Sequence, residues 1–261
     1  LIVEATYGGK SNVLPPRKES EDDLIEQIKE TIDRGGKVLI PELGLGRAQE
    51  TMLILEEAMR EKKLPKVPIY IDGMIWDING IHTAYPDFLN SQVRREVFQD
   101  NNPFVSDIFQ RVGSPSERKE VIEGGPCVVL ATSGMLVGGA SVEYFRHFAP
   151  NKENKICFVC YQGAGSLGKQ VQDGVKTVQM SIEGKDEFIE VNFGIITIDG
   201  LTAHAGRNEL LEYANRTQPK ANKIIINHGD QSRCLDLASS IYKLHHIETN
   251  VPKNLETIRL R

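Results

Sequence analysis

Two histidines and one glutamate stand where this amino-acid sequence could carry out chemistry. His204 lies in D-G-L-T-A-H-A-G-R and His228 in K-I-I-I-N-H-G-D, and each follows a β-forming run and precedes a helical pattern. Glu4 ends the apolar run L-I-V-E. A carboxylate that holds one ring nitrogen of a histidine fixes its tautomer, and a second histidine can bind a metal. One histidine in such a turn is better explained by packing or by capping. Two in equivalent turns make a shared site about as good an explanation as packing.

An α/β fold would place these side chains at the carboxyl ends of strands. Apolar runs over residues 37–41, 67–72, 126–131 and 155–161 each lead through a loop to a helical pattern. This order predicts a parallel, Rossmann-like sheet with its loops on one edge, which is where ligands bind. Residues 177–198 predict a hairpin instead, so we expect antiparallel strands to replace the repeat there.

Capping residues predict where two of the helices begin. Ser20 followed by Asp23 is typical of a capping box and predicts a helix over residues 21–34. Asp230 can cap a helix over residues 231–245. An apolar residue at every third or fourth position gives the first of these helices a face for packing.

The composition is typical of a globular protein. The 261 residues are 40% hydrophobic and 26% charged, with a formal net charge of −5, so the surface is not basic overall. A locally basic cleft is still compatible with that charge. The sequence contains no apolar run long enough to span a bilayer and no charged-then-apolar leader. We expect the four cysteines to be free thiols in a reducing cytoplasm.

Three loops rich in small residues follow predicted strands and could bind an anion. Arg47 follows G-L-G, Ser133 and Gly134 begin S-G-M-L-V-G-G, and Lys169 ends Q-G-A-G-S-L-G-K. Backbone N–H groups at such an edge favour anions, and an arginine suits a phosphate. Each loop alone is explained as well by a tight turn, but together they would line one crevice suited to a polyanion.

The first of these loops also imitates a dinucleotide-binding motif. Gly44 and Gly46 follow a strand, and Asp72 ends the next one. The third glycine of the fingerprint is missing, with Gln49 in its place. An NAD(P)-binding oxidoreductase domain is therefore a weaker alternative.

The order of these motifs resembles the β-CASP branch of the metallo-β-lactamase nucleases, and most closely the archaeal homologues of the cleavage-and-polyadenylation endonuclease. The resemblance covers essentially the full length. It implies three segments: the end of a metallo-β-lactamase segment (1–8), a β-CASP domain (9–199) and a C-terminal metallo-β-lactamase segment (200–261). The matching stretches are L-I-V-E-A-T-Y-G, G-K-V-L-I-P with G-R-A-Q-E, N-P-F, A-T-S-G-M-L-V-G-G, Q-G-A-G-S-L-G-K, T-A-H-A and N-H-G-D.

The resemblance also implies an activity and the residues that carry it. The parent enzyme would hydrolyse RNA phosphodiesters with two zinc ions in RNA 3′-end processing or transcription termination. Cleavage inside the RNA, with or without removal of nucleotides from the 5′ end, is compatible with the resemblance. Glu4 would match the acid of the family's motif A. His204 would match motif B and help to hold the scissile phosphate. His228 would match motif C and bind zinc.

Partners are likewise implied by the resemblance. The β-CASP domain would guide single-stranded RNA, with the three loops as substrate-binding positions. The parent would carry RNA-binding KH domains upstream, form a homodimer through its C-terminal end and lie in the cytoplasm, away from membranes.

The sequence departs from the family's pattern at three places. The H-x-H-x-D-H zinc motif is absent, and the chain opens inside an apolar run, so we expect a C-terminal fragment with at most part of the zinc site and no activity alone. Gly206 stands where most members carry an acid beside the motif B histidine. Glu42 is unexpected near an RNA path. A non-catalytic RNA-binding or scaffold homologue is therefore the main alternative.

Overall fold

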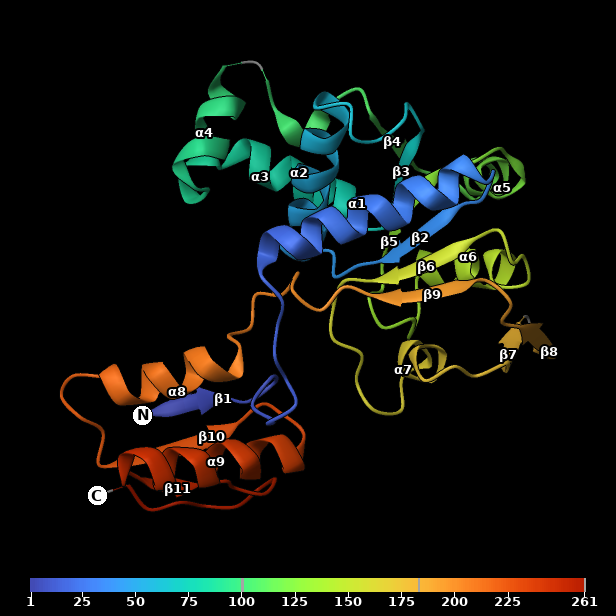
Figure 1. The fold of residues 1–261 in the computed structure, drawn as a ribbon. Helices are drawn as coiled ribbons and strands as arrows, with labels where there is room; N and C mark the ends of the chain where they lie inside the picture. Colours follow the sequence, from blue (N-terminus) through green and yellow to red (C-terminus); the bar gives the residue numbers. More distant parts are fainter. Residues whose placement is uncertain (100, 183, 261) are drawn as a thin grey trace. The chain divides into compact units, whose positions relative to one another are not determined.

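The computed structural model describes residues 1–99, 101–182 and 184–260 and divides the chain into two compact units. Residues 1–15 and 203–261 form unit 1, and residues 16–202 form unit 2 (Figure 1). The two ends of the chain thus fold together, as the expected three segments require. The units divide at residues 15/16 and 202/203, whereas we expected boundaries at 8/9 and 199/200. Residues 9–15 contribute to unit 1, where the backbone N–H of Lys10 donates to Asp236.

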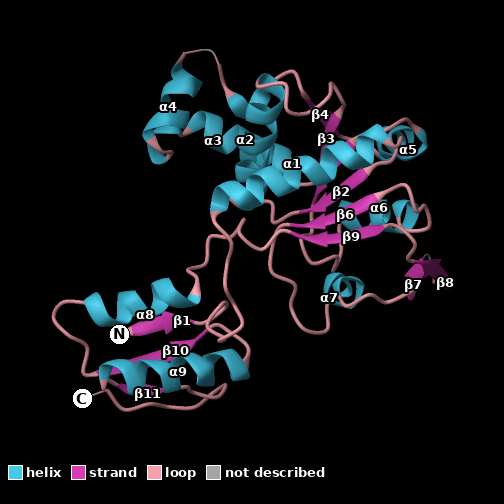
Figure 2. Cartoon of the chain, viewed as in Figure 1, coloured by secondary structure: helices cyan, strands magenta, loops and turns pink. Residues whose placement is uncertain are grey.

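Unit 2 is built on a six-stranded sheet in the order β4-β3-β5-β2-β6-β9, in which every neighbouring pair is parallel. The central strands are buried along their whole length, as apolar runs covered on both faces should be. The common direction of β2, β6 and β9 is visible in Figure 2. The predicted parallel sheet is confirmed. The strands are β2 (Val38–Pro41), β3 (Ile69–Asp72), β4 (Phe109–Val112), β5 (Val128–Ala131), β6 (Lys155–Phe158) and β9 (Gly194–Thr197).

Two hydrophobic clusters flank this sheet and hold its helices. One contains Leu24 and Ile28 of the first helix and Met52 of the second. The other contains Tyr144 and Phe145. The apolar positions that recur every three or four residues are the ones that pack. The helices of unit 2 are α1 (Arg17–Asp33), α2 (Arg47–Arg60), α3 (Ile75–Ala84), η1 (Pro86–Phe88), α4 (Ser91–Phe98), η2 (Pro103–Val105), α5 (Pro115–Glu123), α6 (Ala140–Phe148) and α7 (Leu167–Gln172).

The segment expected to end the parallel repeat does so only in part. β7 (Thr177–Ile182) and β8 (Lys185–Glu190) form the predicted antiparallel hairpin. β9 then returns to the main sheet and pairs in parallel with β6. The expectation was wrong for β9, because period-two patterning identifies a strand but not its direction.

Unit 1 is a three-stranded parallel sheet in the order β1-β10-β11, with two helices. Val3, Ile224 and Ile226 point into a core shared with apolar residues of those helices. Helix α9 contacts β10, β11 and α8. The elements are β1 (Ile2–Glu4), α8 (Arg207–Arg216), β10 (Lys223–Asn227), α9 (Gln231–His245) and β11 (Glu248–Asn250).

The buried acid Asp72 joins three elements of unit 2. It ends β3, and its side chain is 3% exposed. Arg118 of α5 donates from Nε to Oδ2 at 2.7 Å and from Nη2 to Oδ1 at 3.0 Å. The hydroxyl of Tyr144 in α6 donates to Oδ2 at 2.9 Å. Asp72 is thus committed to the fold and is not placed to bind a ribose, as the oxidoreductase alternative would require.

Glu42 follows β2 and is completely buried. The hydroxyl of Thr51 donates to its Oε1, while Oε2 has no hydrogen-bond partner. Burial raises the pKa of Glu42 from its ordinary 4.5 to about 8, against the opposing effects of Thr51 and Arg47. The carboxyl is therefore turned inward and neutral at pH 7, which removes the conflict expected between this acid and a polyanion.

Replacing Asp72 with alanine should destabilise the protein by about 3–5 kcal/mol, because the Arg118 charge and the Tyr144 hydroxyl lose their partner. Urea unfolding measures this loss. Asp77→Ala is the matched control, since Asp77 is 73% exposed and its contact with Arg111 is long at 3.9 Å. It should change stability by less than about 0.5 kcal/mol. Equal losses for the two variants would contradict the assigned role.

Glu42→Gln should stabilise the protein at pH 8 but not at pH 5. The proton binds more tightly in the folded state, so wild-type stability falls as pH rises from about 4.5 to about 8, by up to about 1.4 kcal/mol per pH unit. Glutamine keeps the neutral shape at every pH. Thermal unfolding at a series of pH values tests this, with the exposed Glu26→Gln as control. A pH-independent difference between Glu42→Gln and wild type would refute the assignment.

Candidate active site

The candidate site lies in unit 1, where β1 and β10 end side by side. Glu4 is the last residue of β1 and pairs in register with Asn227, the last residue of β10. His228 follows at once, and His204 lies in the turn before α8. The structure thus brings together all three residues that the sequence singled out for chemistry, at the carboxyl edge of a parallel sheet.

The three side chains are close enough to act together. One ligand atom from each lies within 4.8 Å of the others. The rings of His204 and His228 stack at 28° with their centroids 5.5 Å apart. Nδ1 of His204 is 3.5 Å from Oε2 of Glu4. The cluster is accessible, since the side chains of His204 and Glu4 are 37% and 26% exposed and His228 is exposed.

The turn after β1 holds the cluster in place, and sequence reasoning missed its role. The backbone N–H of Thr6 donates to Oε2 of Glu4 at 2.7 Å. Arg233 of α9 donates to the carbonyl of Thr6, and Arg207 of α8 donates to that of Gly8. The sequence contained one sign of this turn, namely a hydroxyl residue, Thr6, two positions after Glu4.

The backbone at His228 is in the left-handed region, with φ of +48°. An L-residue rarely adopts this conformation, and strain of this kind is found at functional sites. The next residue must be glycine, because a Cβ at Gly229 would lie 2.5 Å from the carbonyl oxygen of Ala5. The sequence N-H-G therefore fits a close approach between the two strand ends.

The donor set fits a zinc ion. Zinc takes imidazole nitrogen and carboxylate oxygen, and catalytic sites use about three protein ligands. Oε1 of Glu4 is buried and has no hydrogen-bond partner, which leaves it able to accept a cation or a donor. Within residues 1–99, 101–182 and 184–260, this is the group of three metal-binding side chains that the structure brings together.

Gly206 does not leave the turn after His204 without an acid. Its backbone N–H donates to Oε2 of Glu209 at 2.8 Å, at the start of α8. The carboxylate beside the His204 ring is Glu4. The departure at Gly206 is thus compatible with an acid-supported histidine.

The substrate-binding candidates all belong to unit 2. Arg47, at the start of α2, forms an ion pair with Glu50. Lys169 in α7 pairs with Asp173 at 2.7 Å. A phosphate would have to compete with these carboxylates. Both cations are partly exposed and lie at helix starts, as the loops predicted.

Ser133 and Gly134 lie in the loop after β5. The Ser133 hydroxyl accepts from the backbone N–H of Val137 at 3.0 Å. Gly134 is buried, and a Cβ there would lie 3.1 Å from the backbone carbon of Glu42. Its carbonyl accepts from Gln162 at 2.9 Å, in the loop after β6. Three loops thus contact one another at the carboxyl edge, as expected, and Gly134 serves their packing.

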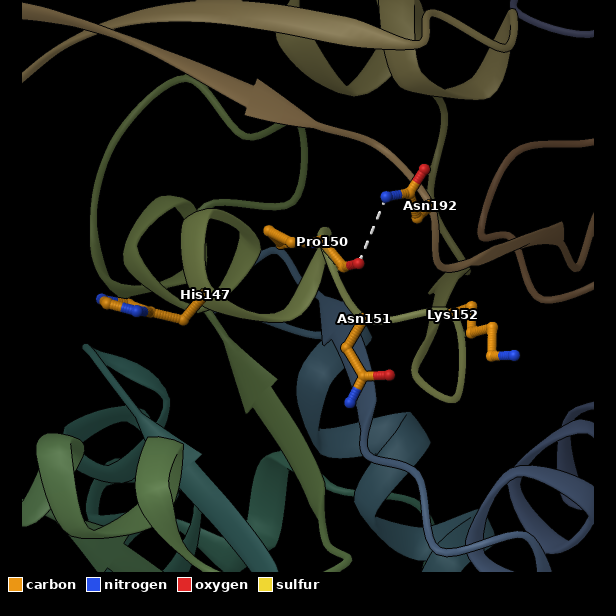
Figure 3. Close-up of a pocket in the computed structure, with 5 residues that line it drawn as sticks. All are labelled: His147, Pro150, Asn151, Lys152 and Asn192. Carbon is orange, nitrogen blue, oxygen red and sulfur yellow. Dashed lines mark hydrogen bonds between the residues drawn. The ribbon is translucent and has the colours of Figure 1, made fainter.

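A surface pocket lies elsewhere in unit 2 and was not predicted. Figure 3 shows its lining residues, among which the side chain of Asn192 donates to the carbonyl of Pro150 at 3.3 Å. His147 is held by Glu143 at 3.1 Å. The pocket contains no pair of groups arranged for acid–base work. Its lining residues are His147, Pro150, Asn151, Lys152 and Asn192.

None of the helices in the described part of the chain is both long and apolar enough to cross a membrane.

Two family models match the chain, and between them they cover parts of both units. The model of the Beta-Casp domain matches residues 48–171. The model of the Zn-dependent metallo-hydrolase RNA specificity domain matches residues 189–252, a range that contains His204 and His228.

Archaeal relatives match the whole chain. Proteins named transcription termination factor FttA are 48% identical in Methanocaldococcus jannaschii, 49% in Pyrococcus horikoshii and 42% in Lokiarchaeum, each over 100% of this chain. The chain spans 40–42% of the length of these relatives. These matches, together with the cluster at the ends of β1 and β10, place the chain: it belongs to the β-CASP branch of the metallo-β-lactamase family.

Proposed function

We propose that this chain is part of a zinc-dependent ribonuclease that hydrolyses RNA phosphodiesters in RNA 3′-end processing or transcription termination. The observation that carries the proposal is the cluster of Glu4, His204 and His228 at one strand edge. The names of the termination-factor relatives support the setting. The match to the Zn-dependent metallo-hydrolase RNA specificity domain supports a metal-dependent hydrolase.

His228 is the residue that we assign to zinc. It is exposed and belongs to the one cluster of metal-binding side chains among the described residues. Bound zinc would act as a Lewis acid and activate water as the nucleophile. A centre with two ions needs more ligands than this cluster offers, and we assign them to a longer parent protein, since the relatives are more than twice as long.

Glu4 and His204 form an acid–histidine pair in this proposal. The carboxylate beside Nδ1 orients the imidazole. The imidazolium can then hold a phosphate oxygen and deliver a proton to the leaving oxygen of the ribose, which is general acid catalysis. Thr6 keeps the carboxylate in position through its backbone N–H.

Unit 2 supplies the path for single-stranded RNA in this account. Its three contacting loops carry Arg47, Ser133, Gly134 and Lys169 at the carboxyl edge of the sheet. Phosphate binding would draw Arg47 and Lys169 from their present carboxylates, so these contacts would be salt-sensitive. Upstream KH domains, a homodimer through the C-terminal end and a cytoplasmic location complete the proposal.

His204→Gln in the full-length parent should lower the rate of RNA cleavage by about 10²–10⁴-fold, because the proton donor is lost. Zinc content should stay the same, since His228 remains. His147→Gln is the matched control, as this histidine is also partly exposed and paired with a glutamate. Cleavage of a labelled single-stranded RNA, with and without a chelator, is the assay, and the 261-residue chain serves as the inactive reference.

Unchanged cleavage in His204→Gln would remove the proposed role. No cleavage by the wild-type parent, together with retained RNA binding, would instead support the scaffold alternative.

A further inference from the structure

Thr6 contacts both sides of the candidate site at once. It is 5% exposed and lies in the turn directly after β1. Its backbone N–H donates to Glu4. Its hydroxyl Oγ1 is 3.2 Å from Nδ1 of His228 and also 3.2 Å from the carbonyl oxygen of His228. One side chain thus holds both the ring and the backbone of the residue assigned to zinc.

Hydrogen-bond counting fixes the direction of these two contacts. A hydroxyl has one proton to donate, and a carbonyl oxygen can only accept. If the Thr6 proton goes to the His228 carbonyl, the ring must donate from Nδ1–H to Oγ1, and both bonds are made. If the Thr6 proton goes to Nδ1 instead, no proton is left for the His228 carbonyl, and only one bond is made. The arrangement with more bonds protonates Nδ1 and leaves the lone pair on Nε2.

We propose that Thr6 is a positioning residue that sets the tautomer of His228, so that Nε2 is free to bind a metal. This rests on the proposed function in that His228 is taken as a zinc ligand. The hydrogen bond at one ring nitrogen decides which nitrogen takes the metal. The same hydroxyl bond supports the left-handed backbone of His228, together with the backbone N–H of Ala5, which donates to the same carbonyl at 3.3 Å.

The matched pair of variants is Thr6→Val and Thr6→Ser. Valine has the shape of threonine without the hydroxyl, whereas serine keeps the hydroxyl. Both retain the backbone N–H that donates to Glu4. Thr6→Val compared with wild type reports on the hydroxyl, and Thr6→Ser controls for the loss of the methyl group. Thermal unfolding of each variant shows that it is folded before the test.

The readout is the tautomer of His228 in the metal-free 261-residue protein, measured by two-bond ¹H–¹⁵N NMR on ring-labelled histidine at about pH 8.5, where imidazole is neutral. His228→Gln identifies the signal among the six histidines. We expect a protonated Nδ1 and a bare Nε2 in wild type and in Thr6→Ser, and a shift toward protonated Nε2 in Thr6→Val. A protonated Nε2 in wild type, or the same tautomer in Thr6→Val, would overturn the proposal.

A zinc titration separates this proposal from the proposed function. Thr6→Val should weaken zinc binding about 10–100-fold relative to Thr6→Ser, as loss of a ligand's outer partner does. If wild type has the expected tautomer but His228→Gln binds zinc as well as wild type does, the assignment of His228 to zinc fails while the role of Thr6 stands. If wild type instead has a protonated Nε2 but His228→Gln loses zinc binding, the role of Thr6 fails while the assignment of His228 to zinc stands.

Discussion

The parallel pairing of β1 with β10 is the constraint on which the candidate site depends. It joins Ile2, Val3 and Glu4 to Ile225, Ile226 and Asn227, residues separated by more than 220 positions. The pairing puts Glu4 and the residue before His228 at the same level of one edge. Bringing together the ends of so long a loop costs conformational entropy. This cost is smaller once unit 2 has folded, because unit 2 makes up most of the loop. Arg233 and Arg207 then hold the turn after β1 by donating to the carbonyls of Thr6 and Gly8.

The two units use their acids in opposite ways. In unit 2, Asp72 ends β3 and Glu42 follows β2, and both are buried. Asp72 is held by Arg118 and Tyr144, and Glu42 is neutralised by burial. In unit 1, Glu4 lies at a partly exposed strand end beside two accessible imidazoles. A buried acid without access to solvent is not placed to meet a substrate, whereas a partly exposed acid beside a histidine can take part in proton transfer. In the proposed function, proton transfer therefore belongs to unit 1.

Much of this fold could be predicted because its patterns are local. Buried four-residue runs followed by small-residue loops give the parallel sheet, and the two histidine turns follow from strand-to-helix transitions. The start of α1 could not be predicted in this way. The helix begins at Arg17, after Pro16, and Ser20 is buried inside its first turn with its hydroxyl bonded to the Pro16 carbonyl. Likewise, Asp230 precedes α9 but makes no side-chain cap.

The remaining differences depend on contacts that are distant in sequence. β9 joins β6 in parallel although an antiparallel hairpin lies between them in the chain, and no period-two pattern encodes this direction. Thr6 acts through His228, 222 residues away, and Glu42 is buried by the packing of loops after other strands. Residue types identified the chemistry of the site, but the side chains that orient it became visible only in three dimensions.

The central claim is that His228 binds zinc beside the acid–histidine pair of Glu4 and His204, and zinc-edge anomalous diffraction tests it most directly. Crystals of the 261-residue protein grown with zinc should show an anomalous peak about 2.0–2.1 Å from a ring nitrogen of His228, and the peak should be lost in His228→Gln. Zinc bound only elsewhere, at the cysteines or at His147, with no peak at the ends of β1 and β10, would contradict the account.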